Sequence, residues 1–375
     1  MKKSLLAAAA LLAATGAVAQ SSVNMYGVVD TGYLFEKKSS ATYGADGSLK
    51  KKEDTKTAGF NSGYLFGPRV GFKGEEALGN GLSATYNLEM GFNSTTGAFN
   101  GGGSFGRRSV VGLKGEFGHA TLGWNNTPLD NFAMDIDGNT RGDVSVTDKY
   151  TGLHYEVTFS GLRIHAMVGG DSSKTKEGNA ETKKKTSSGY GLGLRYTMDN
   201  FMIGGAVQQF KAKEKDVAAT KDTSSTRTEW GLAASYDFGV ARLRSHYVVT
   251  ENKVNGSNAK SKWEHYNVGV SVPMGAATLY AEYGRNRASA VNDGLMLKGY
   301  AADAASFGND YRVKGSGNNF VIGADYELSK RTMIYARARR IADLKANVSN
   351  ATSGAHLGKI KGYSNQFAVG LKHTF

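Results

Sequence analysis

The sequence is dominated by segments in which apolar and polar residues alternate without a break. Between residues 81 and 93 every second side chain is apolar, and the positions between them are polar or glycine. The apolar positions there are Leu82, Ala84, Tyr86, Leu88, Met90 and Phe92. The same alternation recurs in 162–168, 242–249, 320–328 and 367–375. Because a period of two puts successive side chains on opposite faces of a β-strand, the chain is predicted to be all-β with two distinct faces on each strand.

Two all-β architectures have such strands. In a soluble sandwich the apolar face meets a second sheet, whereas in a membrane barrel it meets lipid and the polar face lines a lumen. The connections alternate in length, which is typical of a barrel with tight periplasmic turns and long external loops. The short connections are 116–118, 198–200, 238–239 and 273–275, and the long polar ones are 37–59, 171–189, 211–226 and 288–315.

Aromatic residues end many of the apolar faces, as in the pairs Tyr33 and Phe35 or Tyr280 and Tyr283. Aromatic belts of this kind mark the two interfaces of a membrane. We therefore expect a transmembrane antiparallel β-barrel of sixteen strands, closed so that no sheet edge is exposed.

The first nineteen residues have the features of a secretory signal peptide: a basic start, an apolar centre and a small-residue cleavage pattern at 17–19. We expect 1–19 to be removed and 20–375 to form a single barrel domain. Loss of Lys2 and Lys3 lowers the formal net charge from +13 to +11. Export argues against nucleic acid as a partner of this basic chain, and the absence of cysteine excludes a disulfide framework.

One stretch, from Asn125 to Asp148, shows neither the strand period nor a helical period. It carries several aspartates against a single base, Arg141. A loop of this length is either a solvated surface connection or a functional element. The candidate acids of a pore constriction in this loop are Asp130, Asp135, Asp137 and Asp143.

Four segments together resemble the general diffusion porins of the Gram-negative outer membrane, and in particular the neisserial and related β-proteobacterial branch. They read VNMYGVVDTGY, PRVGFKGEEALGNGLSATYNLEMGF, FGRRSVVGLKGEFGHATLG and NQFAVGLKHTF. The resemblance implies a homotrimer in which the third external loop folds into each barrel and its acids face a ladder of arginines. Two departures from the family pattern are Trp124, where an arginine is common, and Met134 to Gly138, which replaces a Pro-Glu-Phe-Gly run.

The resemblance and the strand parity together give a set of arginines that faces the lumen. The resemblance contributes Arg69 and Arg107, while parity would send Arg108 outward toward the external rim. The predicted basic wall is Arg69, Arg107, Arg163, Arg195, Arg242, Arg244, Arg337 and Arg339. The acids assigned to the same face are Asp30, Glu89, Glu282, Asp325 and Glu327. Each assignment depends on register, because a slip of one residue reverses the face.

The predicted function is a passive, water-filled channel for small hydrophilic solutes and ions. The loop acids alone would favour cations, but eight wall arginines and the basic net charge predict a weak to moderate preference for anions. The alternatives are an outer-membrane barrel enzyme of the protease or lipase kind and a surface β-adhesin. The sequence has no HExxH or phosphate-loop motif, so we expect no catalytic group, metal or cofactor.

Three features suggest further partners. The terminal Phe375 completes the lipid face of the last strand, and in outer-membrane proteins a terminal aromatic resembles the signal read by the barrel-insertion machinery. Lysine clusters at 50–52 and 183–185 are either solvated loop charges or contacts for lipopolysaccharide phosphates. Outer-membrane lipid would surround the apolar faces.

Overall fold

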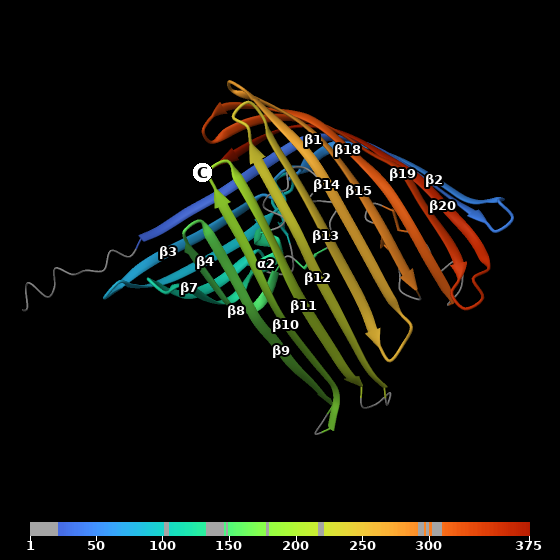
Figure 1. Ribbon diagram of the computed structural model, residues 1–375, viewed down its shortest axis with the longest axis horizontal. Coiled ribbons are helices and arrows are strands. Elements are labelled where there is room, and N and C mark those ends of the chain that lie inside the picture. Colours follow the sequence, from blue (N-terminus) through green and yellow to red (C-terminus); the bar gives the residue numbers. More distant parts are fainter. Residues whose placement is uncertain are drawn as a thin grey trace, which may run out of the picture.

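The chain folds into a closed antiparallel barrel (Figure 1). The computed structural model describes residues 22–100, 105–132, 146–147, 149–177, 180–216, 221–291, 296–297, 300–301 and 310–375. Antiparallel pairing between strands that are close in sequence continues around the wall, and the first strand also pairs with the last. Closure satisfies the backbone hydrogen-bonding groups of the wall, as a lipid environment requires. Among the described residues, no helix combines the length and apolar character needed to cross a membrane.

The first half of the wall consists of β1 (Ser22–Gly44), β2 (Leu49–Ser62), β3 (Arg69–Gly79), β4 (Leu82–Phe92), β5 (Phe99–Asn100), β6 (Arg108–Gly115), β7 (Gly118–Asn126), β8 (Lys149–Phe159) and β9 (Leu162–Glu177). The second half consists of β10 (Ala180–Met198), β11 (Phe201–Asp216), β12 (Lys221–Asp237), β13 (Arg242–Asn255), β14 (Lys260–Met274), β15 (Ala277–Val291), β18 (Tyr311–Ser329), β19 (Thr332–Asn350) and β20 (His356–Thr374). A short hairpin, β16 (Met296–Leu297) and β17 (Tyr300–Ala301), and the helix α2 (Pro128–Phe132) are not part of this sheet.

The wall has sixteen positions, as predicted, because two of them are each built from two segments. β2 pairs with the outer part of β1 and β3 with its first residues, so β2 and β3 share one position. β5 and β6 share another, since both pair with β4. The acidic loop therefore follows the fifth position and is the third external loop, also as predicted.

The break between β2 and β3 leaves part of the sheet unpaired. Within the described residues β2 pairs only with β1, so its second edge has no strand beside it. The expectation that closure leaves no edge is wrong for this outer segment. The reason is that β4, which pairs with β3, ends at Phe92 and turns back, with the Asn93 amide donating to the Ala98 carbonyl at 2.7 Å, so it does not continue beside β2.

One end of the barrel has tight turns, and the other has long hairpins. At the tight end, Asn80, Ser160 and Asp199 adopt positive φ, as two-residue hairpins require. At the other end, the long polar connections are largely strand: Lys37 pairs with Lys56 in the first hairpin, and Lys185 with Glu214 between β10 and β11. The sequence analysis predicted these segments to be loops. Both faces of each strand are polar there, so hydrophobicity does not alternate along the chain with a period of two.

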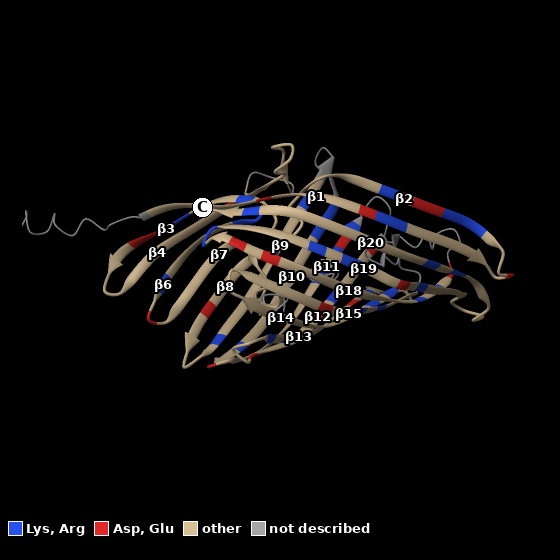
Figure 2. Ribbon diagram, turned by 90° about the horizontal axis from the view of Figure 1, so that it is seen from above, with Lys and Arg blue, Asp and Glu red and all other residues tan. Residues whose placement is uncertain are grey.

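The two faces of the wall have opposite character. Leu192, Val207 and Leu232 are outward and exposed, whereas the inward Gln208 and Glu229 are completely buried. This inversion of a soluble protein's pattern is the one expected when lipid covers the outside. Figure 2 shows the charged segments concentrated toward the ends of the strands that carry the long hairpins, notably on β2, β18, β19 and β20.

Candidate pore constriction

The first group of predicted wall arginines converges on one carboxylate. Arg107 Nε lies 2.7 Å from Glu89 Oε1, and Arg69 Nε lies 3.5 Å from Glu89 Oε2. Tyr26 also donates its hydroxyl to Glu89, at 3.1 Å. These residues come from β1, β3, β4 and the bend before β6, so the group ties four neighbouring wall segments together at the inner surface.

Arg108 belongs to the same group, contrary to the parity prediction. It lies directly across from Glu89 in the β4–β6 register, and residues directly opposite in a ladder share a face. The physical reason is the bend at Arg107 between β5 and β6, which breaks the alternation so that both arginines face inward. Glu89 therefore forms ion pairs with two arginines and lies across the strand pair from a third.

A second group occupies the wall from β13 to β19. Arg244 pairs with Glu282 at 2.6 Å and Arg337 with Asp325 at 2.7 Å. Both guanidinium groups also lie over the ring of Tyr280, at 5.6 and 4.6 Å from its centroid. Two further predicted arginines make neutral contacts from the same inward register: Arg242 donates to Ser235 at 3.2 Å, and Arg339 donates to Asn319 at 3.0 Å.

The third group lies on β9 and β10 and meets the loop itself. Arg163 and Arg195 pair directly across the two strands and stack on the ring of Phe132, with distances of 5.3 and 5.6 Å to its centroid. Arg163 also forms an ion pair with Glu156. Because Phe132 belongs to α2, these contacts place α2 against the inner face of the wall.

The helix α2 starts where its sequence favours a helix. Thr127 is a preferred cap residue, and Pro128 at the first helical position loses no hydrogen bond. All five residues of α2 are buried. Gly193 on β10 makes the close approach possible, because a Cβ there would lie 2.2 Å from the Phe132 ring.

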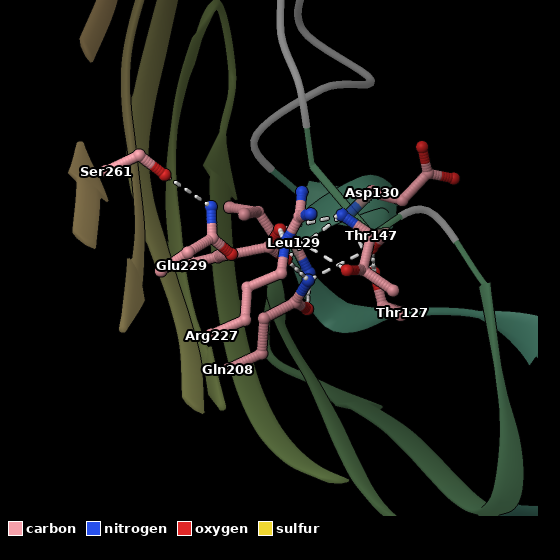
Figure 3. A network of polar contacts seen from close by, with 9 residues as sticks. Thr127, Leu129, Asp130, Thr147, Gln208, Arg227, Glu229 and Ser261 are labelled. Carbon is pink, nitrogen blue, oxygen red and sulfur yellow. Dashed lines mark hydrogen bonds and ion pairs between the residues drawn. The ribbon is translucent and has the colours of Figure 1, made fainter. Parts of the chain in front are cut away.

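A polar clamp on β11 and β12 holds both ends of the third loop (Figure 3). At the start of the loop, the Leu129 amide donates to Gln208 Oε1 at 3.2 Å. At its end, the Thr147 amide donates to the Glu229 carboxylate at 2.9 and 3.1 Å. Gln208 Nε2 joins the two contacts by donating to Glu229 at 2.6 Å and to the Thr147 carbonyl at 3.1 Å. Arg227 completes the clamp with an ion pair to Glu229 at 2.5 Å.

A second anchor connects α2 to β8 and β9 through histidine. Asn131 Nδ2 lies 3.0 Å from His165 Nδ1, and His165 Nε2 lies 3.1 Å from His154 Nδ1. His154 Nε2 in turn lies 3.1 Å from the Tyr150 carbonyl oxygen. Two neutral imidazoles satisfy this whole row, with each ring donating through Nε2 and accepting through Nδ1. The third loop is thus attached to the wall at several separate strands.

Comparison with known proteins gives the family. The sequence profile described as Gram-negative porin matches residues 6–346. The chain belongs to the Gram-negative porin family. It is 28% identical to an outer membrane porin protein of Bordetella pertussis and 29% identical to the major outer membrane protein P.IB of Neisseria gonorrhoeae, with 100% of both chains covered in each case. Its fold is similar to that of the anion-selective porin from Comamonas acidovorans, at a TM-score of 0.64 and 21% identity over 95% of this chain and all of that one.

The structure describes only part of the predicted acidic loop. Asp130 lies in α2, is 2% exposed, and directs its carboxylate away from the clamp in Figure 3. Asp135, Asp137 and Asp143 lie outside the described residues. Of the acids assigned to the wall, Asp30 is fully buried and accepts from the Tyr335 hydroxyl at 2.7 Å.

The carboxyl end of the porin closes the barrel. The amide of Phe375 donates to the Gly27 carbonyl at 3.1 Å, and the amide of Gly27 donates back to Phe375 at 3.0 Å. The Phe375 ring covers Gly27 so closely that a Cβ there would lie 2.3 Å from it. These contacts show that Phe375 packs against β1 at the end of the last strand. Its role as an insertion signal stays a prediction.

Sequence reasoning missed Gln208, Glu229, Glu156 and His154. All four occupy inward positions of their strands, so strand parity alone could have assigned them to the inner face of the wall. Their role follows only from the path of the third loop, whose contacts with Gln208 and Glu229 span 79 and 82 residues of sequence.

Proposed function

We propose that the porin is a passive, water-filled outer-membrane channel whose narrowest part lies between the third loop and the arginines of the wall. The observation that carries this proposal is the clamp by Gln208 and Glu229, which fixes the loop against the inner face of β11 and β12. Charges fixed on opposite sides of an aqueous slot orient dipolar solutes, and the width of the slot sets their size limit. Such a channel needs no conformational cycle.

The charge arrangement favours anions. Glu89 is shared by Arg69 and Arg107 and faces Arg108 across the strand pair, so this part of the wall has a surplus of positive charge. Arginine stays charged at any working pH, and charges close to a narrow passage are screened little by salt. The structurally similar porin of Comamonas acidovorans is named as anion-selective, in agreement with this proposal.

The test is the zero-current potential across a bilayer under a KCl gradient. Arg69→Gln with Arg107→Gln should shift this potential toward cation selectivity, most strongly at low salt. The matched control is Lys51→Gln with Lys52→Gln, which removes the same charge from an exposed hairpin where both lysines already have acidic partners. A cation-selective native pore, or equal shifts in the two variants, would show that the loop carboxylates dominate.

The two alternative functions receive less support. An enzyme would need reactive groups at the external rim, but His165 and His246 are buried in the wall at 0% and 3% exposure. Among the described residues, no three metal-ligating side chains lie together. An adhesin would not require a closed barrel with a loop clamped inside it.

We also infer the partners that the family implies. The chain would assemble as a homotrimer, with outer-membrane lipid and lipopolysaccharide around it, after removal of a signal peptide at 1–19. The Phe375 terminus would be read by the barrel-insertion machinery. Support for these partners comes from membership in the porin family and from the apolar outer face of the barrel.

A further inference from the structure

The bend between β2 and β3, residues 63–68, packs on the inner surface of the wall. Tyr64 in this bend stacks on Tyr335 of β19, with 6.4 Å between the ring centroids and 16° between the ring planes. Tyr335 is two residues from the inward Arg337, and residues two apart along a strand share a face. The bend therefore lies on the lumen side of the barrel, although it belongs to neither of the strands that it joins.

One buried carboxylate, that of Asp30 on β1, holds this bend. Asp30 is completely buried. Its Oδ2 accepts from the amides of Leu65 and Phe66 at 2.9 and 2.7 Å, and its Oδ1 accepts from the Tyr335 hydroxyl at 2.7 Å. Its backbone carbonyl accepts from the Gly63 amide at 2.9 Å. Hydrogen bonds to an ionised acceptor are stronger than neutral ones, so the carboxylate is the main anchor of the bend.

The far end of the bend meets the first group of wall arginines. The Gly67 carbonyl accepts from Arg69 Nη1 at 3.2 Å. A Cβ at Gly67 would lie 3.1 Å from Arg107 Nη1, so the backbone there lies directly beside this guanidinium group. Both arginines share the Glu89 carboxylate. The bend is therefore one of the surfaces that determine where the two guanidinium groups lie.

We propose that Asp30 is a positioning residue for the ion preference of the pore. Gly67 directly follows Phe66 in the chain. A carboxylate that fixes the Phe66 amide therefore also fixes the backbone against which the guanidinium groups of Arg69 and Arg107 lie. Because Asp30 is completely buried, it acts on passing ions through these contacts and does not touch them. The inference rests on the proposed function, since it concerns the same two arginines.

The charge of Asp30 alone would have the opposite effect on the ion preference. A carboxylate in the wall favours cations, so its removal should favour anions whichever neutral residue replaces it. A positioning role instead distinguishes between the replacements. Asp30→Asn keeps a carbonyl oxygen for the two amides and an NH₂ group that can donate to the Tyr335 hydroxyl oxygen, whereas Asp30→Ala keeps neither. The two variants remove the same charge and differ in their hold on the bend.

The test compares the zero-current potentials of Asp30→Asn and Asp30→Ala under a KCl gradient, with heat-modifiable migration to show that both variants are folded. We expect Asp30→Asn to keep or slightly strengthen the native anion preference. Asp30→Ala should shift the potential toward cation selectivity, because the released bend no longer holds the arginines in place. Equal potentials in the two variants would overturn the positioning role.

The matched control makes the same two substitutions at Asp54, an exposed acid of the first hairpin, and should keep the native potential in both. In a pore that also carries Arg69→Gln and Arg107→Gln, the difference between the two Asp30 variants should disappear. A difference that persisted there would also overturn the proposal. If Asp30→Ala does not fold, Asp30→Glu replaces it: the charge is unchanged, and the extra methylene in a buried site displaces the bend. A native potential in Asp30→Glu would then overturn the positioning role.

Failure of the proposed function would give a different result. A cation-selective native pore, or a native potential in the variant with Arg69→Gln and Arg107→Gln, would overturn both the anion preference and the part given to Asp30. Equal potentials in the two Asp30 variants of a pore whose preference does depend on these arginines would overturn the positioning role alone.

Discussion

At the scale of single residues, Glu229 is the group on which the position of the third loop most depends. Its carboxylate accepts from the Thr147 amide, Gln208 and Arg227, and it is completely buried. Removing this carboxylate leaves the buried donor of Gln208 unsatisfied, which costs about 1–3 kcal/mol, while Arg227 is partly exposed and can be solvated.

We expect Glu229→Ala to release the end of the loop and to give a larger and noisier single-channel current. Glu229→Gln keeps one acceptor oxygen and should have a smaller effect. Glu53→Ala, on the exposed first hairpin, is the control and should leave the current unchanged. A steady native current from Glu229→Ala would mean that the histidine anchor through Asn131 suffices to hold the loop.

Residue-scale prediction from the sequence succeeded where the alternation is unbroken. Arg163, Arg244 and Arg337 lie on the expected inner register because β9, β13 and β19 keep period two around them. It failed at Arg108 because the bend before β6 is not encoded in hydrophobic periodicity. Whether these arginines form the selectivity filter stays a prediction that bilayer recording must test.

At the scale of elements, α2 shows how a short helix is positioned by the strand beside it. Glycine on β10 provides the space that the Phe132 ring fills, and Arg163 and Arg195 cover that ring. The sequence predicted the loop and its place after the fifth strand position. It could not predict the helix contacts, because these depend on the register of four strands that are distant in sequence.

Gly193→Val should displace Phe132 and move α2, because the added Cβ would begin 2.2 Å from the ring. We expect altered single-channel conductance with the barrel still folded, as shown by heat-modifiable migration. Gly59→Val is the control, since no atom lies within 4 Å of a Cβ there. Native conductance in both variants would contradict the packing of α2 against Gly193.

At the scale of the whole molecule, the barrel closes through the pairing of β1 with β20, and the last residue extends that pairing. Phe375 and Gly27 exchange two backbone hydrogen bonds where β20 meets β1. The barrel class and its strand number followed from the sequence because alternation and turn chemistry are local. The extension of the strands into long hairpins did not, because residues polar on both faces show no period.

Deleting Phe375 separates its two roles. If it acts as an insertion signal, the shortened chain should refold in detergent nearly as well as the native chain but reach the outer membrane in much smaller amounts. Heat-modifiable migration after refolding and immunoblotting of membrane fractions measure the two quantities. Equal losses in both would assign Phe375 a structural role alone, and no loss in either would remove both roles.

Within the part of the chain that the structure describes, β2 has an unpaired edge, and its charged residues are of the kind that opposes the addition of another strand. A free strand edge offers backbone donors and acceptors to any other chain, and so invites aggregation while barrels crowd together before and after insertion. Charged side chains oppose that pairing, since a second strand would have to bury or repel them. β2 carries Lys50, Lys51, Lys52, Glu53, Asp54 and Lys56 in close succession. A neighbouring chain that added a strand at this edge would have to place its own side chains beside these charges.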